Sequence, residues 1–114
     1  MDKYRISLIV PIYGVEKYIA KFAESALDQT YQDLQFIFVN DGTKDRSMEI
    51  LRDLIANRYA HLQSRIVIID KENGGLPSAR KAGLDVAEGE YVLFADSDDW
   101  METDAVEKVM AKAE

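Results

Sequence analysis

Four short runs of apolar residues recur along the chain, and each has the length and composition of a β-strand. Their residues are mostly β-branched or aromatic, and they follow one another almost without polar interruption, which is typical of strands covered on both faces. The runs cover residues 6–10, 34–39, 66–69 and 91–95. The sequence therefore predicts a sheet of four buried strands.

The segments between and after these runs have the spacing of amphipathic helices, with apolar side chains at steps of three and four residues. The predicted helices run from about residue 16 to 29, 46 to 59, 77 to 88, and 104 to the end. Asp45 or Ser47 is a candidate N-cap for the second helix, and Thr103 is one for the fourth. Gly89 is placed to end the third helix.

Strands and helices therefore alternate in the order β-α-β-α-β-α-β-α, with short connections. This order predicts right-handed crossovers and a Rossmann-like α/β fold, a mainly parallel sheet with helices on both faces. No repeat, low-complexity tract or linker divides the 114 residues, so we expect a single domain over residues 1–114. Its ligand site is expected at the carboxyl ends of the strands, where open α/β sheets bind ligands.

Composition excludes several classes of function. The chain has 14 basic and 21 acidic residues, a net charge of −7, which is unsuited to nucleic acid. It has no Cys and one His, so thiol chemistry and multi-His metal centres are excluded, and a His-based triad depends on His61 alone. The sequence shows no membrane-spanning segment and no signal-peptide pattern. We expect a soluble cytoplasmic protein, with the inner membrane surface as an alternative location.

Acidic charge is concentrated near the end of the chain. Residues 96–114 carry seven acidic and two basic residues, and Asp96, Asp98 and Asp99 directly follow the fourth apolar run. If the strand continues past Ala95, the side chains of Asp96 and Asp98 point the same way. Two carboxylates facing one point favour a hard divalent cation such as Mg²⁺ or Mn²⁺. The alternative is a solvated turn that caps the fourth helix, and Asp99 is a capping candidate in both cases.

The other three apolar runs also end in polar or glycine-bearing clusters. Asp41 follows the second run, where it suits a hydrogen bond from a base or ribose, or serves only as an Asp-Gly turn residue. Tyr13 follows the first run and suits stacking on a base or packing at the rim. The segment 73–75, Asn-Gly-Gly, follows the third run and allows close approach of a ligand or a tight turn.

Five motifs stand in order along nearly the whole chain, and their order and spacing are more specific than any one of them. They occupy residues 10–13, 25–31, 40–47, 73–80 and 96–99. Together they resemble the motifs of the family 2 glycosyltransferases, which are inverting enzymes with the GT-A fold. Two positions depart from the family pattern, because Asn40 stands where an acid is more common and Lys81 where Asn is usual.

The resemblance implies a site for a nucleotide diphosphate sugar, a UDP-sugar in the first instance. It implies that Tyr13 lies against the base, that Asp41 bonds the base, and that Asp98 holds Mn²⁺ or Mg²⁺ on the diphosphate. Charge supports the cation independently, because a diphosphate would otherwise meet the densest acidic cluster of a protein with net charge −7. The nucleotide-binding residues so implied are Pro11, Tyr13, Asp41, Asn73, Gly75, Arg80 and Asp96, and the metal ligands are Asp98 and Asp96.

No general base for the acceptor hydroxyl is identified. The resemblance implies that the base and the acceptor site follow later in the chain, well after the Asp-x-Asp motif. Glu102 and Asp104 are nominal candidates, but their expected place at the start of the fourth helix favours capping. We therefore expect a truncated domain, inactive alone, from a polysaccharide-biosynthesis enzyme whose glycan or lipid-linked acceptor is unknown. Its unpaired sheet edge predicts homo-oligomers.

Other nucleotide and phosphate folds lack their signatures here. A phosphoacceptor receiver domain needs an acidic pair after the first strand, where this chain has Pro11-Ile12-Tyr13. A dinucleotide-binding oxidoreductase needs G-x-G-x-x-G there, and only Gly14 is present. The remaining alternative is a noncatalytic nucleotide-binding or interaction module.

Overall fold

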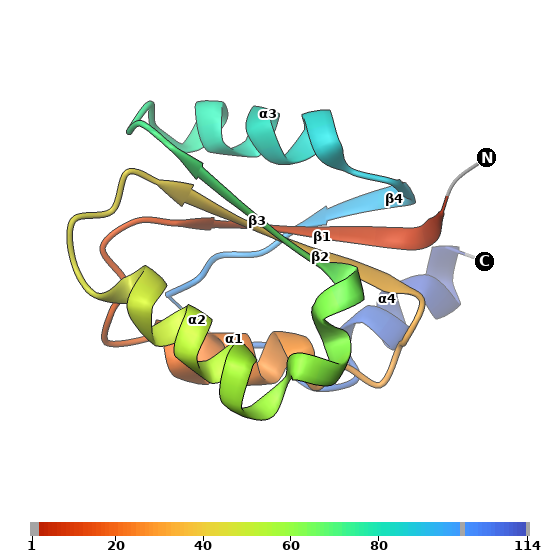
Figure 1. Ribbon diagram of the computed structural model, residues 1–114. Coiled ribbons are helices and arrows are strands. Elements are labelled where there is room, and N and C mark those ends of the chain that lie inside the picture. Colours follow the sequence, from red (N-terminus) through yellow and green to blue (C-terminus); the bar gives the residue numbers. More distant parts are fainter. Residues whose placement is uncertain (1–2, 99, 114) are drawn as a thin grey trace.

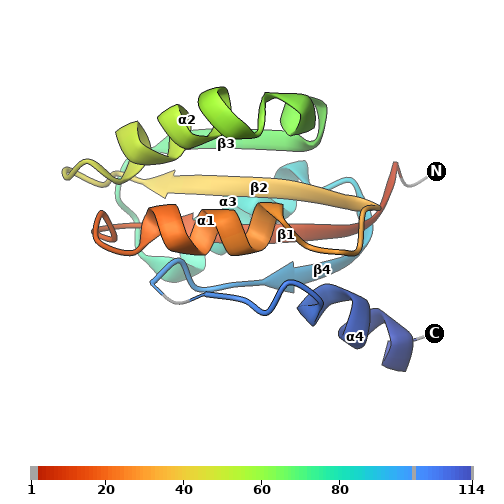
Figure 2. The ribbon, with the colours of Figure 1, turned by 90° about the horizontal axis from the view of Figure 1, so that it is seen from below.

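The structure is a computed structural model in which residues 3–98 and 100–113 are described. One four-stranded sheet has the order β3-β2-β1-β4, and every neighbouring pair is parallel (Figure 2). The predicted parallel α/β fold is confirmed. The strands are β1 Tyr4–Ile12, β2 Leu34–Asp41, β3 Ile66–Lys71 and β4 Gly89–Phe94.

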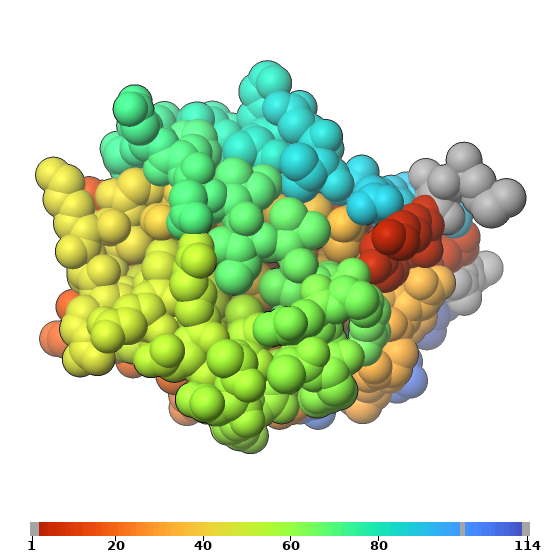
Figure 3. All heavy atoms as spheres, in the orientation of Figure 1, coloured from red at the N-terminus to blue at the C-terminus, as the bar shows by residue number. Residues whose placement is uncertain are grey.

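Helices cover both faces of the sheet, as predicted. Figure 1 shows α3 on one face and α1 and α2 on the other, with α4 on the α1 side beside β4. A 3-10 helix, η1, follows α2, and the space-filling view shows α2, η1 and β3 together on one side of the molecule (Figure 3). The helices are α1 Ile19–Leu27, α2 Ser47–Arg58, η1 Ala60–Arg65, α3 Leu76–Val86 and α4 Ala105–Ala113.

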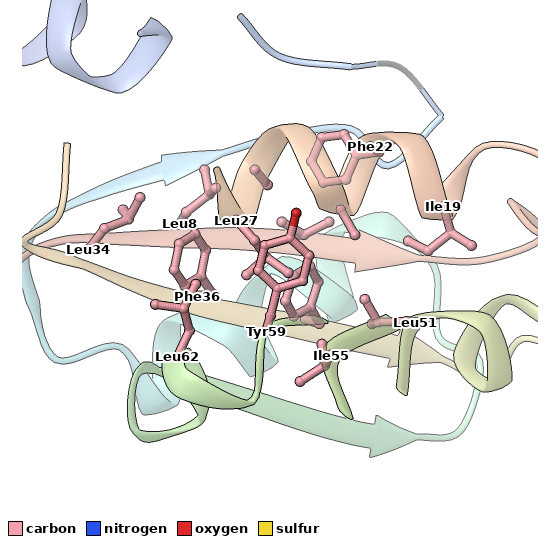
Figure 4. Close-up of a cluster of buried hydrophobic side chains, with 14 of the residues drawn as sticks. Leu8, Ile19, Phe22, Leu27, Leu34, Phe36, Leu51, Ile55, Tyr59 and Leu62 are labelled. Carbon is pink, nitrogen blue, oxygen red and sulfur yellow. The ribbon is translucent and has the colours of Figure 1, made fainter. Parts of the chain in front are cut away.

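Alternation along β1 divides the core between the two faces. Ile6, Leu8, Val10 and Ile12 are buried against α1, α2 and α4 in the larger cluster, part of which Figure 4 shows. Ile9 points to the other face and packs with Ile37, Val39 and Ala79 under α3. The close approach of α3 depends on the glycine at 83, because a Cβ there would lie 2.5 Å from Ile9 Cγ2.

Burial is uneven across the sheet, which corrects the expectation of four strands buried on both faces. The central strands β1 and β2 are almost wholly buried, whereas β3 and β4 are mostly half-buried or exposed. The reason is position, because β3 and β4 are the two edges of the described sheet. An apolar run shows that a strand meets hydrophobic partners, but it does not show on how many sides.

Two predicted boundary residues have different roles in the structure. The third helix ends at Val86, and Gly89 is the first residue of β4 rather than the helix stop. Gly89 is required there by space, since a Cβ would collide with the backbone of Ser7 in the neighbouring strand. At the start of α4, the amide of Val106 donates to Oε1 of the buried Gln29 at 3.0 Å. Gln29 thus caps a helix 77 residues away in the sequence, which the sequence did not reveal.

The β4 edge exposes apolar side chains, including Tyr91 and Phe94. We propose that this edge supports self-association of the chain, because unpaired strand edges with apolar side chains are templates for pairing. Sedimentation velocity over a wide concentration range is expected to show a species larger than the monomer. Tyr91→Lys should return the protein towards the monomer, since lysine on an edge strand opposes pairing. A strictly monomeric wild type would contradict the proposal.

Candidate functional site

A cavity of about 550 Å³ lies at the carboxyl ends of the strands. This volume is within the range of roughly 300–1,000 Å³ that small-molecule and cofactor sites occupy. The last residue of β2 and the segments after β1, β3 and β4 contribute to it, so the predicted edge of the sheet does carry the candidate site. The residues that line it are Pro11, Tyr13, Val15, Asp41, Asn73, Gly75, Leu76, Ala79, Asp96, Ser97 and Asp98.

Arg80 is the predicted nucleotide-binding residue that does not line this cavity. Its guanidinium lies over the ring of Phe94, with the central carbon 5.2 Å from the ring centre. Its Nε atom is buried and has no hydrogen-bond partner among the described residues. The structure therefore places the Arg80 guanidinium against Phe94 and outside the cavity lining, and a nucleotide contact for Arg80 stays a prediction.

Asp41 is held by the loop between β3 and α3. The residue is only 4% exposed, and its Oδ1 atom accepts from Lys71 Nζ and from the amide of Gly74, both at 3.0 Å. Its Oδ2 atom accepts from the amide of Gly75 at 3.1 Å and from Asn73 Nδ2 at 3.3 Å. Four donors match the roughly four lone-pair positions of a carboxylate. Asp41 thus organises the loop that forms one wall of the cavity.

The same contacts keep Asp41 ionised. Burial by itself raises the pKa of this carboxyl group, but the hydrogen bonds from Gly74, Lys71 and Gly75 outweigh it and lower the pKa below its ordinary value. The sequence reasoning missed Lys71. In the parallel pairing of β2 with β3, Lys71 stands directly opposite Asp41. Aligning the two apolar runs as neighbouring parallel strands would have brought these two residues together.

Asn40, a departure from the family pattern, has a specific use here. Its Nδ2 atom donates to Asp70 at 2.9 Å, and its Oδ1 atom accepts from the amide of Thr43 at 3.0 Å. The hydrogen bond from Asn40, together with the nearby Arg52, lowers the pKa of Asp70. An acid at position 40 would instead set two carboxylates against each other, so the amide suits this chain. Lys81, the other departure, pairs with Asp85 at 3.2 Å outside the cavity.

Three side chains after β2 hold three consecutive amides of the loop that follows Tyr13. The amide of Gly14 donates to Thr43 Oγ1 at 2.8 Å, that of Val15 to Ser47 Oγ at 3.0 Å, and that of Glu16 to Asp45 Oδ2 at 3.2 Å. Both hydroxyl groups in turn donate to Asp45 Oδ1, at 2.7 Å from Thr43 and 2.6 Å from Ser47. Asp45 therefore orients both hydroxyls so that their lone pairs face the loop. This network places Tyr13 beside the cavity.

Asp45 also accepts the amide of Ser47 at 3.0 Å. The N-cap of α2 is nevertheless Arg46, so the prediction that Asp45 or Ser47 is the N-cap was wrong by one residue. Burial raises the pKa of Asp45, but the hydrogen bonds from Ser47, Thr43 and Glu16 outweigh it and lower the pKa from 3.8 to about 2.

Asp45→Asn is expected to lower the free energy of unfolding by about 1–2 kcal/mol at neutral pH. A shift of one pKa unit corresponds to about 1.36 kcal/mol, and this contribution is reduced because Asp45 is partly exposed to solvent. Because the pKa is lower in the folded state, this contribution is present above the unfolded value of 3.8 and is lost as the pH falls towards 2. Urea unfolding of both proteins at pH 7 and near pH 3 checks this. A difference that grows on acidification would contradict it.

Asp96 and Asp98 both line the cavity, but not because the strand continues. The fourth strand ends at Phe94, and residues 97 and 98 form a turn, so the alternation argument for these acids was wrong in its premise. Ser97 is buried in that turn and donates to the carbonyl of Pro11 at 2.7 Å, which fixes the turn against β1. Both carboxylates are exposed. Asp99 lies outside the described residues.

The two carboxylates suit a divalent cation that a ligand helps to hold. Within residues 3–98 and 100–113 no group of three His, Cys, Asp or Glu side chains is arranged to bind a metal. Mg²⁺ and related ions are commonly bound by one or two carboxylates, with phosphate oxygens and water as the other ligands. Asp96 and Asp98 fit that incomplete type of site and do not fit a closed structural metal site.

Neither nominal base candidate reaches the cavity lining. Asp104 pairs with Lys108 at 3.3 Å, and the carbonyl of Glu102 accepts from Gln29 Nε2 at 2.7 Å and from the amide of Ala105 at 3.0 Å. Both residues lie just before α4, in keeping with a role at the helix start.

The chain is thus an open parallel α/β protein whose cavity lies at the carboxyl edge of the sheet, the position where folds of this class bind ligands. Residues 7–114 match the family model described as glycosyl transferase family 2. The chain belongs to this family.

Relatives of the chain are considerably longer. It is 43% identical over 108 residues to the glycosyltransferase GlyA of Streptococcus pneumoniae, covering 95% of this chain and 15% of GlyA. It is 43% identical over 109 residues to the uncharacterized glycosyltransferase EpsJ of Bacillus subtilis, covering 96% of this chain and 30% of EpsJ. The crystal structure of S. aureus TarS with UDP superimposes with a TM-score of 0.78 at 28% identity, covering 94% of this chain and 31% of that one. Among the described helices, none has the length and apolar character needed to cross a membrane.

Proposed function

We propose that this chain binds the nucleotide diphosphate of a sugar donor, a UDP-sugar, and forms the donor side of an inverting glycosyltransferase. The observation that carries the proposal is the cavity of about 550 Å³ that collects Tyr13, Asp41, Asp96 and Asp98 at the carboxyl edge of the sheet. The structures of TarS with UDP and with UDP-GlcNAc support it, since both superimpose on this chain at 28% identity.

Each residue takes a role that its surroundings allow. Tyr13 is exposed beside the cavity and offers a ring face to the base. Asp41 already has four donors, so a base contact through it would require one of them to be exchanged, and its main role is to hold residues 73–75 in place. Asp96 and Asp98 would hold Mn²⁺ or Mg²⁺, which when bound neutralises the diphosphate and stabilises the departing nucleoside diphosphate.

The acceptor hydroxyl needs a general base, and we infer that it does not come from the described residues. The carboxylates that line the cavity belong to Asp41, Asp96 and Asp98. The first is saturated by hydrogen bonds and the other two are assigned to the cation. We therefore propose sugar transfer for a longer protein that contains this domain, at a cytoplasmic site or the inner membrane surface. A noncatalytic nucleotide-binding module is the alternative, and an assay of sugar transfer by the longer protein separates the two.

Calorimetric titration with UDP tests the donor site directly. In Mn²⁺ we expect saturable binding, and in EDTA we expect the dissociation constant to rise about tenfold or more, because the diphosphate then faces two uncompensated carboxylates. UMP, which differs from UDP only in lacking the second phosphate, is the matched ligand and should gain much less from Mn²⁺. Failure of UDP to bind under either condition would contradict the proposed function, and equal binding with and without Mn²⁺ would remove the metal from it.

A further inference from the structure

A second hollow opens beside the candidate donor site. It has a volume of about 140 Å³ and lies between the start of α1 and the segment after Asp98. Asp98 lines both this hollow and the larger cavity, so the two meet at the residue assigned to the metal. The residues that line the smaller hollow are Lys17, Tyr18, Lys21, Asp98 and Trp100.

The lining combines positive charge with aromatic faces. Lys17 and Lys21 are exposed, and neither forms an ion pair with a carboxylate within residues 3–98 and 100–113. Tyr18 and Trp100 are 51% and 50% exposed, and the Lys21 ammonium lies 5.9 Å from the centre of the Trp100 ring. The protein has a net charge of −7, yet two lysines and one carboxylate line this hollow, so its local charge is positive. The two exposed aromatic rings add apolar surface beside these charges.

The segment that carries Trp100 is fixed on both sides. Before Asp98, Ser97 donates to the carbonyl of Pro11 at 2.7 Å, and after Trp100 the amide of Met101 donates to Ser25 Oγ at 2.9 Å. The first contact ties the segment to β1 and the second ties it to α1. A ligand in the hollow therefore meets Ser97 and Met101 already tied to other elements, which lowers the cost of ordering these two residues on binding.

We propose that this hollow is an acceptor subsite that binds an anionic sugar unit of the acceptor glycan. This inference rests on the proposed function, because it places the acceptor next to the diphosphate end of the donor. The lysines recognise a carboxylate or phosphate, and the faces of Tyr18 and Trp100 cover the apolar side of a sugar ring. The volume is below the roughly 300–1,000 Å³ of sites for drug-sized ligands, so it accommodates one unit of a longer acceptor.

Trp100 is the only tryptophan of the chain, so its fluorescence reports on this hollow. Titration with hyaluronan hexasaccharide, which carries carboxylates, and with glucose 6-phosphate, which carries a phosphate, is expected to change the emission saturably in at least one case. Chitohexaose, a neutral hexasaccharide, should bind about fivefold or more weakly than the anionic probe that binds. Added salt should weaken the anionic probe and leave chitohexaose unchanged.

Charge removal within and outside the hollow completes the test. The double variant Lys17→Gln, Lys21→Gln should weaken the anionic probe about fivefold or more, whereas Lys81→Gln, Lys112→Gln removes the same charge elsewhere and should leave it unchanged. Equal binding of neutral and anionic sugars, no fluorescence response to either anionic probe, or an unchanged lysine variant would overturn the subsite. If inorganic pyrophosphate binds as tightly as the anionic sugar and displaces it, the hollow is a general anion site and the proposed sugar subsite is overturned.

Parallel calorimetry with UDP and Mn²⁺ separates the two proposals. Binding of UDP without a fluorescence response to the anionic sugars overturns the subsite and leaves the donor site standing. Absence of UDP binding counts against the proposed function itself.

Discussion

Asp98→Ala is expected to remove the cation dependence of UDP binding, with the dissociation constant in Mn²⁺ rising about tenfold or more towards the value in EDTA. The physical reason is the incomplete metal site. Because Asp96 and Asp98, the proposed ligands, are the exposed carboxylates that reach the cavity among the described residues, loss of one would leave a single protein ligand. The ion then no longer offsets the charge of the diphosphate. Calorimetry on both proteins, with and without Mn²⁺, measures the effect.

Asp104→Ala is the matched control. It removes a carboxylate from the same acidic part of the chain, where Asp104 pairs with Lys108 and lies outside the cavity. We expect UDP binding by this variant to keep its wild-type dependence on Mn²⁺. Equal affinity of the Asp98→Ala variant and the wild type for UDP in Mn²⁺ would exclude Asp98 as a metal ligand in this protein.

Asp41→Ala is expected to cost about 3–5 kcal/mol of the free energy of unfolding, the range for breaking a buried ion pair by removal of one partner. The variant leaves the amides of Gly74 and Gly75 without their acceptor, and the Lys71 ammonium keeps only the carbonyl of Glu72. Since Gly75 and the neighbouring Asn73 line the cavity, UDP binding should weaken even under conditions where the protein stays folded. Urea unfolding followed by circular dichroism gives the free energy, and calorimetry gives the affinity.

Asp70→Ala tests whether burial causes this effect. Asp70 also accepts from a cation and an amide, Arg52 at 2.7 Å and Asn40 at 2.9 Å, but its side chain is 58% exposed. Exposed pairs contribute about 0–1 kcal/mol, so this variant should lose far less stability than Asp41→Ala. Similar losses in the two variants would show that the Asp41 network is worth no more than a surface pair.

The order of elements and the position of the site followed from local patterns. The nearly continuous apolar runs at β1 and β2 fixed two strands, and the three- and four-residue steps at Ile19 and Phe22 fixed α1. In a parallel sheet all carboxyl ends meet at one edge, so Tyr13, Asp41 and Asp98 had to gather there once the alternation was recognised. This inference needed the topology and no detail of side-chain geometry.

Contacts between distant segments did not follow from such patterns. Asp45 and Ser47 were predicted only as cap candidates, yet together with Thr43 they hold three amides about 30 residues earlier in the chain. The Gln29 cap of α4 and the space that Gly89 leaves for Ser7 are of the same kind. A sequence shows which polar groups need partners, but several distant partners satisfy the same need equally well.

By itself, the sequence determined the class of fold and the edge of the sheet that carries the candidate site, because periodicity and strand ends are local properties that every parallel α/β chain expresses in the same way. The family followed separately, from the resemblance of five motifs in order along the chain. Only the tertiary structure decided what each polar side chain does there. It showed that Asp41 is saturated by Lys71 and the loop amides, and that Asp98 borders two hollows rather than one. The physical reason is that hydrogen bonds and charges act over about 3–6 Å in space, whatever the separation along the chain.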